Sequence, residues 1–312
     1  MNMIDEPLQF QARLAGAVQP GKVMLVGAGP GAPDLLTVRA SRILSQARLL
    51  LYDHLVSPGI LQLAPPGAEL ICVGKERGRH TLPQASIIEL MVRLAQSGRS
   101  LVRLKGGDPY IFGRGGEEAQ GLAAAGIAFE VVPGISAAQG AAAWAGIPLT
   151  HRDHAASVVF ATGHMRDDGG DDGRTGCRDD LDWSLLARPR QTVVIYMGLG
   201  TLPRVCSQLI AHGLAADTPA AIVERATCPG QRAIVGDLRS LPALVTRHDV
   251  HSPALVMIGS VVSLHAQLGV RAADAFAHVG AVDGVDGVAA GAPRRQPVTT
   301  ITPFISGCGP QP

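Results

Sequence analysis

Residues 22–53 read KVMLVGAGPGAPDLLTVRASRILSQARLLLYD, and this stretch contains the unit from which the first half of the chain is built. Its apolar run at 23–29 predicts a buried strand that leads into a glycine turn. Leucine, isoleucine and alanine then fall mostly on one face of a helix expected over 34–47, and 47–53 predicts the next strand. A strand, a helix and a strand in succession indicate a right-handed crossover and a mostly parallel sheet.

The same alternation continues along the chain and predicts two α/β domains, over 22–150 and 151–268. Further strands of the first domain are expected at 69–74, 100–107 and 129–134, with helices at 83–97 and 117–126. The second domain is expected to have shorter strands at 157–164, 192–199, 219–226, 232–238 and 252–262, a helix at 201–212 and a hairpin near Thr227–Arg232.

Three segments lack this periodicity. The N-terminal extension 1–21 and the tail 269–312 are expected to be disordered. The segment 166–182 is rich in Asp, Gly and Arg, and we expect it to form a mobile insertion in the second domain.

The composition argues against several classes of protein. The 312 residues are 46% apolar with a net charge of +1, so no basic surface for nucleic acid is expected. The five cysteines form no CxxC pair, and the spacing of His80, His151, His154 and His164 matches no zinc template. No signal peptide and no apolar run of the roughly 20 residues that a membrane span needs is present. We therefore expect a cytoplasmic protein without a metal, membrane or nucleic-acid partner.

The glycine turn Gly27-Ala-Gly29-Pro-Gly31 follows a strand and precedes a helix, which is the setting of a dinucleotide-binding turn. Its spacing is GxGxG and not GxGxxG, and Pro30 removes a backbone N–H that a pyrophosphate would use. Three interpretations remain open from this turn alone. They are a nicotinamide site with Asp53 on the ribose, a simple tight turn, and a site for a nucleoside without phosphates.

The segment 103–118, RLKGGDPYIFGRGGEE, gathers three basic residues and five glycines directly after a strand. The Gly-Gly pair at 106–107 lets a ligand approach the backbone, and Asp108 can accept hydrogen bonds from a ribose diol or an amine. Arg103 and Arg114 are suited to pair with carboxylates. The alternative is an ordinary loop whose Asp-Pro starts a turn.

The segment PGISAA at 133–138 places small residues after a predicted strand. They would leave room for a flat ring or another ligand at the N-terminus of a helix. Close packing of that helix is the alternative explanation.

Taken together, these segments resemble the uroporphyrinogen-III C-methyltransferases of the tetrapyrrole methylase superfamily. The resemblance covers about residues 22–265. The segments that carry it are, in order, VGAGPGAPDLLT, LYDHLVS, VGKERGRHTLPQ, VRLKGGDPYIFGRGGEE, VVPGISAAQGAAAWAGIPLTHRDHA, TGH, VIYMGL and SPALVMIGSVV. The resemblance implies two α/β domains of the tetrapyrrole methylase type, an active site in the trough between them, and a homodimer.

The resemblance also implies a methyl donor, S-adenosyl-L-methionine, which lies folded between the domains and leaves as S-adenosyl-L-homocysteine. Ser136 stands where relatives often have Thr, and Ala226 stands where they often have Gly. The positions that match the family's cofactor-binding residues are Pro30, Gly106, Gly107, Asp108, Ile111, Ser136, Ala137, Met197 and Ala226.

Asp53 and Lys75 match the proton acceptor and donor proposed for the family. Attack of a pyrrole carbon on a sulfonium methyl group needs alignment, and the loss of a proton that accompanies it can be assisted by a carboxylate or an amine. The tetrapyrrole substrate carries eight carboxylates, so cations are expected around it. The candidates are Arg103, Arg114, Arg152 and Lys75.

The implied reaction is methylation of uroporphyrinogen III at C-2 and C-7, which gives precorrin-2 through precorrin-1 and feeds sirohaem biosynthesis, cobalamin biosynthesis or both. One alternative keeps the fold and changes the substrate to a later precorrin, ribosomal RNA or diphthine. A nicotinamide-dependent oxidoreductase or a non-catalytic nucleotide sensor is the alternative from another class.

Overall fold

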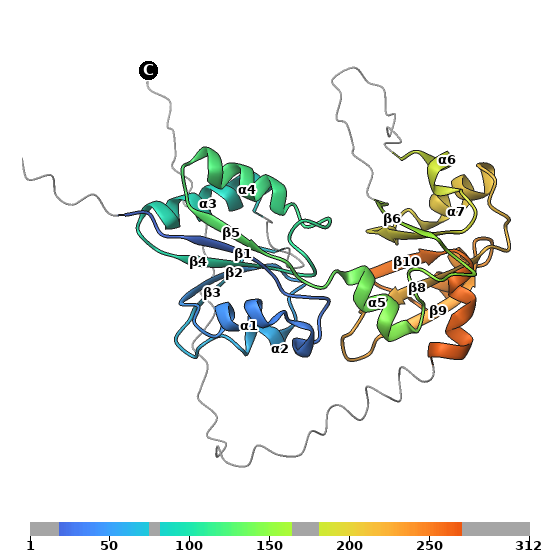
Figure 1. The fold of residues 1–312 in the computed structure, drawn as a ribbon, viewed down its shortest axis with the longest axis horizontal. Coiled ribbons are helices and arrows are strands. Elements are labelled where there is room, and N and C mark those ends of the chain that lie inside the picture. The colour runs from blue at the N-terminus through green and yellow to red at the C-terminus, as the bar shows by residue number, and fades with distance from the viewer. Residues whose placement is uncertain (1–18, 75–81, 164–180, 270–312) are drawn as a thin grey trace, which may run out of the picture.

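The computed structural model describes residues 19–74, 82–163 and 181–269. They form two α/β domains, each built around a five-stranded sheet (Figure 1). The predictions for Lys75 and for the two disordered ends lie outside the described residues, apart from 19–21 and Gly269. The prediction for the insertion 166–182 also lies outside them, apart from its last two positions.

The first domain alternates strands and helices, as the sequence predicts. Its sheet is parallel throughout, in the order β3-β2-β4-β1-β5. The strands are β1 (Val23–Gly27), β2 (Leu49–Tyr52), β3 (Glu69–Cys72), β4 (Leu101–Lys105) and β5 (Phe129–Val132), and the helices are η1 (Pro33–Leu35), α1 (Val38–Leu44), α2 (Pro58–Leu61), α3 (Gln84–Gln96) and α4 (Gly115–Ala124).

Helices cover both faces of this sheet. In β1, Leu25 packs into the core under α3 and α4, while its neighbour Val26 packs into the core under α1 and α2. Successive side chains of a strand point to opposite faces, so both faces are buried. Burial on both faces explains why 23–29 reads as a continuous apolar run.

The continuous helix predicted over 34–47 is wrong in its first turn. A 3-10 helix starts at Pro33, and α1 begins only after Thr37, whose backbone is extended. The Thr37 hydroxyl accepts the N–H of Ala40, which makes it the N-cap. The apolar periodicity did not reveal this cap, because Leu35 and Leu36 continue the helical pattern across it.

The second domain has a mixed sheet in the order β6-β7-β10-β8-β9, in which only β6 and β7 run parallel. The hairpin predicted near Thr227–Arg232 is confirmed by the antiparallel pairing of β8 and β9. The strands are β6 (Ser157–Thr162), β7 (Gln191–Tyr196), β8 (Pro219–Glu224), β9 (Arg232–Asp237) and β10 (Ala254–Ile258), and the helices are α5 (Ala137–Ala145), α6 (Trp183–Leu186), α7 (Leu202–Ala211), α8 (Leu241–Arg247) and η2 (Ser260–Leu264).

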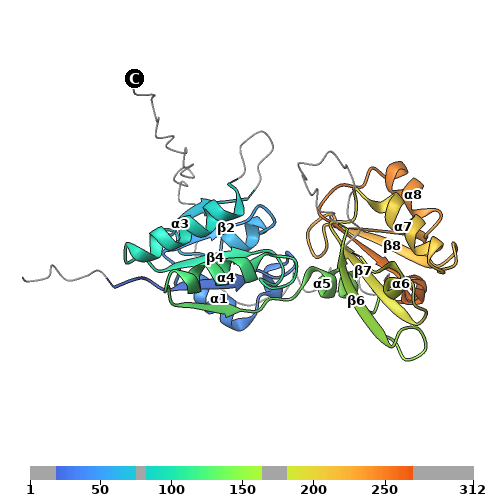
Figure 2. The same cartoon turned by 90° about the horizontal axis from the view of Figure 1, so that it is seen from above.

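Helix α5 lies between the two domains (Figure 2). Its alanines pack on the second sheet, with Ala138 and Ala142 in one core with Val194 and Met257. Small side chains allow this close approach. Helices α6, α7 and α8 cover the opposite face of the sheet. The first domain thus passes into the second through a helix that belongs to the second core.

The strand expected over 252–262 is shorter than predicted. It ends at Ile258, because Gly259 takes a φ of +132° and the chain continues as the 3-10 helix η2. Within the described ranges, no helix has the length and apolar character that crossing a bilayer requires.

Glycines pack backbone against backbone where β1, β4 and β5 end. A Cβ built on Gly134 would lie 2.2 Å from the carbonyl oxygen of Gly107 and 3.0 Å from the Cα of Gly27. A Cβ built on Gly27 would in turn lie 2.6 Å from the nitrogen of Gly134. The ends of these three strands can therefore meet only because side chains are absent.

We expect Gly134→Ala to lower the free energy of unfolding by about 1–3 kcal/mol, since the added methyl group meets backbone that cannot turn away. Urea denaturation measures the change. Gly67→Ala is the matched control, because a Cβ there meets nothing within 4 Å. The control is expected to stay within about 0.5 kcal/mol of the native protein. Equal stability of the two variants would contradict the packing described.

Candidate active site

The carboxyl ends of β1 and β4 lie side by side where the chain changes direction across the first sheet. From β1 the chain passes through α1 to β2 on one side, whereas from β4 it passes through α4 to β5 on the other. Ligands of open α/β sheets bind outside the carboxyl ends of the strands at such a switch point. The turns that follow β1 and β4 are therefore the expected location of a site.

Backbone hydrogen bonds join these two turns. The N–H of Ala28 donates to the carbonyl of Lys105 at 2.7 Å, and Gly29 and Gly107 exchange two bonds of 3.1 Å and 2.7 Å. Gly29 and Gly107 have φ values of +71° and +69°, in the region that favours glycine. The two glycine-rich segments singled out in the sequence thus form one structural unit.

Asp108 ties the loop after β4 to the end of β5. Its Oδ1 accepts the N–H of Tyr110 at 2.8 Å, and its Oδ2 accepts the N–H of Gly134 at 3.0 Å. Each carboxylate oxygen retains a lone pair, so the group can also accept from a hydroxyl or amine of a ligand. Further along the loop, Phe112 and Arg114 have φ values of +49° and +57°. Such backbone conformations are costly outside glycine and cluster at functional sites.

Tyr196, at the end of β7, connects the second domain to this loop. Its hydroxyl accepts the N–H of Ala138 at 3.1 Å, and its ring centroid lies 4.7 Å from that of Phe112. Burial raises the pKa of Tyr196, so the phenol is neutral near pH 7. The next residue, Met197, has a φ of +53° and is 53% exposed.

The turn after β8 contacts the glycine turn after β1. Thr227 Oγ1 accepts the N–H of Ala32 at 3.1 Å. A Cβ built on Gly31 would lie 3.3 Å from the carbonyl oxygen of Ala226. Ala226 therefore lies near a first-domain loop, and Met197 directly follows Tyr196, whose ring packs on Phe112 of another first-domain loop. These contacts agree with the sequence-based expectation that both domains contribute to one site.

The N-terminus of α5 lies at the same junction. Ser136 is buried and caps the helix: its Oγ accepts the N–H of Gln139 at 3.3 Å, and the Gln139 side chain accepts the N–H of Ser136 at 3.0 Å. Pro30 packs on this helix at Gly140, where a Cβ would lie 2.5 Å from the Pro30 Cβ. Ile111 and Ala137 pack against the core that α5 shares with the second sheet.

Asp53 follows β2 and belongs to a cluster of charged side chains. Arg103 Nη2 donates to Asp53 Oδ1 at 2.6 Å, and Lys105 Nζ lies 3.7 Å from Asp53 Oδ2. Both cations also donate to Oε1 of Glu118, Arg103 through Nε at 3.1 Å and Lys105 through Nζ at 3.0 Å. Burial, followed by the charge of Arg103, lowers the pKa of Lys105. Sequence reasoning did not single out Lys105 and Glu118, although a Lys at the end of an apolar strand was a usable signal.

Arg114, a second predicted substrate-binding arginine, lies in the loop after β4 and is exposed. It donates two hydrogen bonds to the carboxylate of Glu117, at 2.9 Å and 2.7 Å. Arg152 lies in the turn before β6, where its carbonyl accepts from Arg190 at 2.7 Å. Among the described residues, no hydrogen bond or ion pair joins Arg152 to the loops after β1, β2 or β4. The structure therefore places Arg103 in β4, Arg114 in the loop that follows it and Arg152 in the turn before β6.

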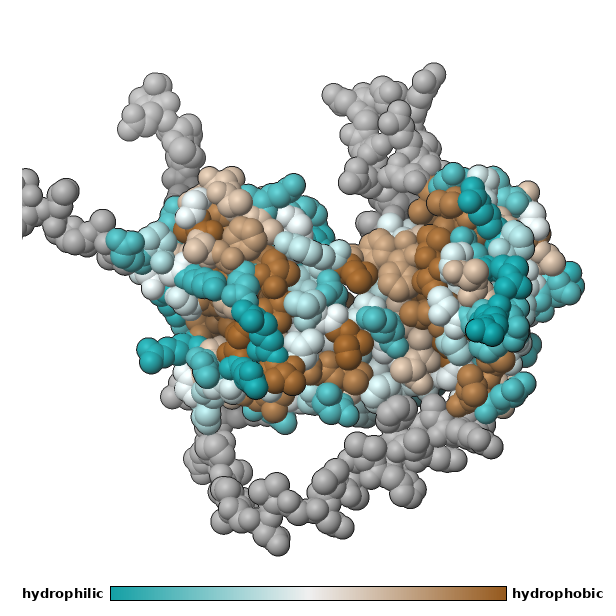
Figure 3. All heavy atoms as spheres, viewed as in Figure 1, coloured by the Kyte–Doolittle hydropathy of each residue, from teal (hydrophilic) through white to brown (hydrophobic). Residues whose placement is uncertain are grey.

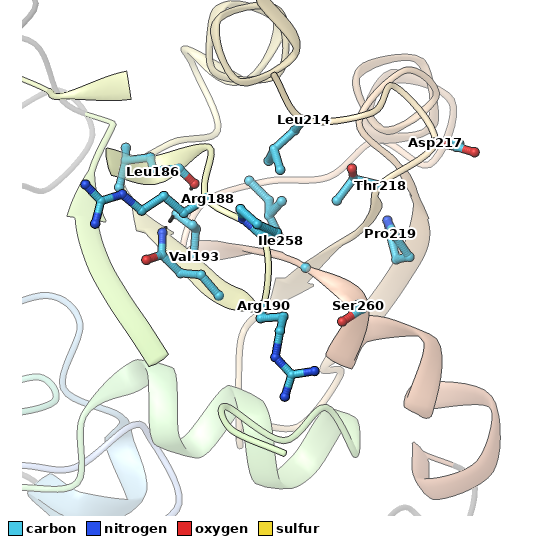
Figure 4. A pocket seen from close by; sticks show the side chains of 13 residues that line it. Leu186, Arg188, Arg190, Val193, Leu214, Asp217, Thr218, Pro219, Ile258 and Ser260 are labelled. Carbon is cyan, nitrogen blue, oxygen red and sulfur yellow. Dashed lines mark hydrogen bonds between the residues drawn. The ribbon is translucent and has the colours of Figure 1, made fainter. Parts of the chain in front are cut away.

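Two hollows of the described surface lie at the other ends of the strands. One, of about 350 Å³, is lined by Arg188, Arg190 and Gln191 near the start of β7, together with Asp217 (Figure 4). The second, of about 630 Å³, is lined by Lys22, Arg48 and Arg99 where β1, β2 and β4 begin. Neither contains a residue predicted for the site.

No group of three or more His, Cys, Asp or Glu side chains within 19–74, 82–163 and 181–269 could hold a metal ion. The rings of His151 and His154 lie 5.0 Å apart in the turn before β6. His80 and His164 lie outside the described ranges.

Comparison with known proteins finds a family whose sequence model matches most of this chain. The sequence model of the tetrapyrrole (corrin/porphyrin) methylases matches residues 22–242. The siroheme synthase of Nitrosomonas europaea is 55% identical over 248 residues, which cover 80% of this chain and 50% of that protein. The chain thus spans about half the length of the curated relatives it matches.

Solved structures share the two-domain fold. The native uroporphyrin III C-methyltransferase of Thermus thermophilus has a TM-score of 0.64 and 38% identity, covering 78% of this chain and all of that one. The same protein has been solved in complex with S-adenyl homocysteine. A cobalt precorrin-4 methyltransferase has a TM-score of 0.66 at 28% identity, covering 77% of this chain and 95% of that one.

We expect Tyr196→Phe to lower the free energy of unfolding by about 1 kcal/mol, because the buried N–H of Ala138 loses its acceptor. Thermal or urea unfolding measures it. Tyr110→Phe, at an exposed ring, is the control and is expected to remain within about 0.5 kcal/mol of the native protein. If both variants unfold with native stability, the hydroxyl does not hold the N-terminus of α5 as described.

Proposed function

The chain belongs to the tetrapyrrole methylase family, and from this premise we propose that it transfers methyl groups from S-adenosyl-L-methionine to uroporphyrinogen III. The observation that carries the proposal is the 38% identity to a uroporphyrin III C-methyltransferase along that enzyme's whole length. The 55% identity to a siroheme synthase over half of that protein supports it independently.

The methyl donor would lie at the turns after β1 and β4, within reach of the second domain. Gly106 and Gly107 carry no side chain there, and Asp108 keeps lone pairs for a ribose or amine. The exposed Met197 supplies an apolar surface from the second domain. The turn at Pro30 lacks the N–H that a pyrophosphate would use, so it suits a nucleoside without phosphates better than a nicotinamide dinucleotide.

The other residues that the resemblance assigns to cofactor binding would shape the site through packing, backbone contacts and a helix cap. Ile111 and Ala137 shape the junction through their packing on the second core, and Ala226 offers its backbone beside the first turn. Ser136 acts through the helix cap, since its hydroxyl already holds the N-terminus of α5.

Asp53 would accept the proton that the macrocycle releases. In the transfer, π electrons of a pyrrole carbon form the new C–C bond, and the electron pair of the broken S–C bond stays on sulfur. The macrocycle is left positively charged and becomes neutral when it loses a proton. Asp53 suits this step because its carboxylate is 27% exposed while Arg103 fixes it from behind. Lys75 remains the predicted proton donor.

Cations and apolar groups would hold the substrate. Arg114 is exposed beside the loop and can exchange its pairing with Glu117 for a carboxylate of the tetrapyrrole. Leu55, Tyr110 and Phe112 are exposed in the same region and can contact the ring system. Hydrophobic residues gather on the surface where the two domains meet (Figure 3). Arg103 is buried against Asp53 and Glu118, which favours a supporting role over direct contact with substrate.

The full proposal is methylation at C-2 and then at C-7, with precorrin-1 as intermediate and precorrin-2 as product. The similarity to siroheme synthases favours sirohaem as the destination. The supply of cobalamin biosynthesis, the homodimer, the cytoplasmic location and substrate binding by Arg152 stay predictions from the resemblance and the composition.

The purified protein is expected to add one and then two methyl groups to uroporphyrinogen III, as measured by mass spectrometry in the presence of S-adenosyl-L-methionine. Asp53→Asn is expected to reduce kcat at least about 100-fold, because the proton acceptor is lost. Binding of S-adenosyl-L-homocysteine, measured by titration calorimetry, should be unchanged in that variant.

If uroporphyrinogen III gains no methyl group after incubation with the protein and S-adenosyl-L-methionine, the proposal is wrong. Methylation of a later precorrin in its place would move the substrate assignment to the branch that includes cobalt precorrin-4 methyltransferase. Binding of NAD without binding of S-adenosyl-L-homocysteine would favour the oxidoreductase alternative.

A further inference from the structure

Four charged side chains meet inside the first domain, and only one of them reaches the surface. Arg103, Lys105 and Glu118 are 1%, 2% and 0% exposed, whereas the Asp53 side chain is 27% exposed. The cluster joins the end of β2, two positions of β4 and the first turns of α4.

Such a cluster is an expensive way to fill a core. Removing two cations and two carboxylates from water costs free energy that their mutual attraction only partly returns, and apolar residues of similar size often stabilise a core as well or better. Stability therefore gives no reason for three buried charges at this position. The arrangement around Asp53, the one member that a substrate can reach, does give a reason.

Glu118 accepts hydrogen bonds from both buried cations, Arg103 and Lys105. Its Oε1 accepts from Arg103 Nε at 3.1 Å, from Lys105 Nζ at 3.0 Å and from Gln84 Nε2 at 3.1 Å. Its Oε2 is buried, and no hydrogen-bond partner for it lies in the described part of the chain. The α4 carboxylate thus takes one donor from each cation that faces Asp53.

The two oxygens of Asp53 are held unequally as a result. Oδ1 accepts a 2.6 Å hydrogen bond from Arg103 Nη2. Oδ2 lies 3.7 Å from Lys105 Nζ, beyond hydrogen-bond distance, because Lys105 donates to Glu118. Burial and the neighbouring Arg103 lower the pKa of Lys105, so its ammonium form depends on the carboxylates beside it.

We propose that Glu118 is a positioning residue: it draws Lys105 away from Asp53 and braces Arg103, so that Asp53 is fixed through Oδ1. Its Oδ2, which accepts no hydrogen bond from the described residues, is then available to receive the proton. This inference rests on the proposed methyl transfer. In that reaction the proton leaves the methylated macrocycle and forms a bond to Oδ2, and the electron pair that bound it neutralises the positive ring.

Glu118→Gln tests the inference, because the amide keeps the shape and the Oε1 acceptor but removes the charge that attracts Lys105. We expect kcat for methylation of uroporphyrinogen III to fall at least about tenfold, as Lys105 moves onto Oδ2. The dissociation constant of S-adenosyl-L-homocysteine is expected to stay within about twofold of the wild-type value, since that ligand does not use Asp53.

Glu130→Gln is the matched control. Glu130 also pairs with two cations, Lys22 and Arg39, but on the surface of β5 and away from Asp53. The kcat of the Glu130→Gln variant is expected to equal that of the wild type. Should Glu118→Gln fail to fold, Arg103→Lys replaces it, because it keeps the charge and loses the fork that bridges Glu118 and Asp53.

A double-mutant cycle separates positioning from a merely structural role. If Glu118 acts through Asp53, then Asp53→Asn and Asp53→Asn/Glu118→Gln have the same kcat. A further tenfold loss in the double variant, or wild-type kcat in Glu118→Gln, overturns the inference. A wild-type protein that does not methylate uroporphyrinogen III would instead overturn the proposed function.

Discussion

The turns after β1 and β4 share a pair of backbone hydrogen bonds, between Gly29 and Gly107, that the rest of the site depends on. This bridge can form only where the strand ends approach without side chains, and Gly134 completes the contact from β5. It lies at the switch point of the parallel sheet, where the chain departs in opposite directions. The loops that carry Pro30 and Asp108 are therefore placed by the strands themselves.

The second domain uses this fixed edge as a docking point. Thr227 accepts the backbone N–H of Ala32 in the first glycine turn, and the ring of Tyr196 packs against that of Phe112 in the loop after β4. Met197 and Thr227 have positive φ values, which shows that the ends of β7 and β8 are bent where they meet the first domain. Residues with strained, positive φ values thus lie beside the candidate site in loops of both domains, where the bent backbone positions the neighbouring groups.

Sequence periodicity predicted the first domain well, because strands buried on both faces leave unmistakable apolar runs. It failed at Thr37, where a cap interrupts a continuing pattern, and it did not predict the helices α2, α6 and α8. The resemblance named residues that the fold does bring together, such as Pro30, Gly107 and Asp108. Glu118 escaped notice because a Glu-Glu pair at the start of a helix is usually solvated. Only the tertiary structure reveals that one of the two is buried beneath Asp53.

We expect one site to form where the Gly29–Gly107 bridge meets the second domain. The crystal structure of this chain with S-adenosyl-L-homocysteine is the most direct test of this expectation. In that structure the ligand is expected to contact Gly106, Gly107 and Asp108 on one side and Met197 on the other. A ligand bound in the hollow beside Arg188 and Arg190, at the opposite end of β7, would contradict it.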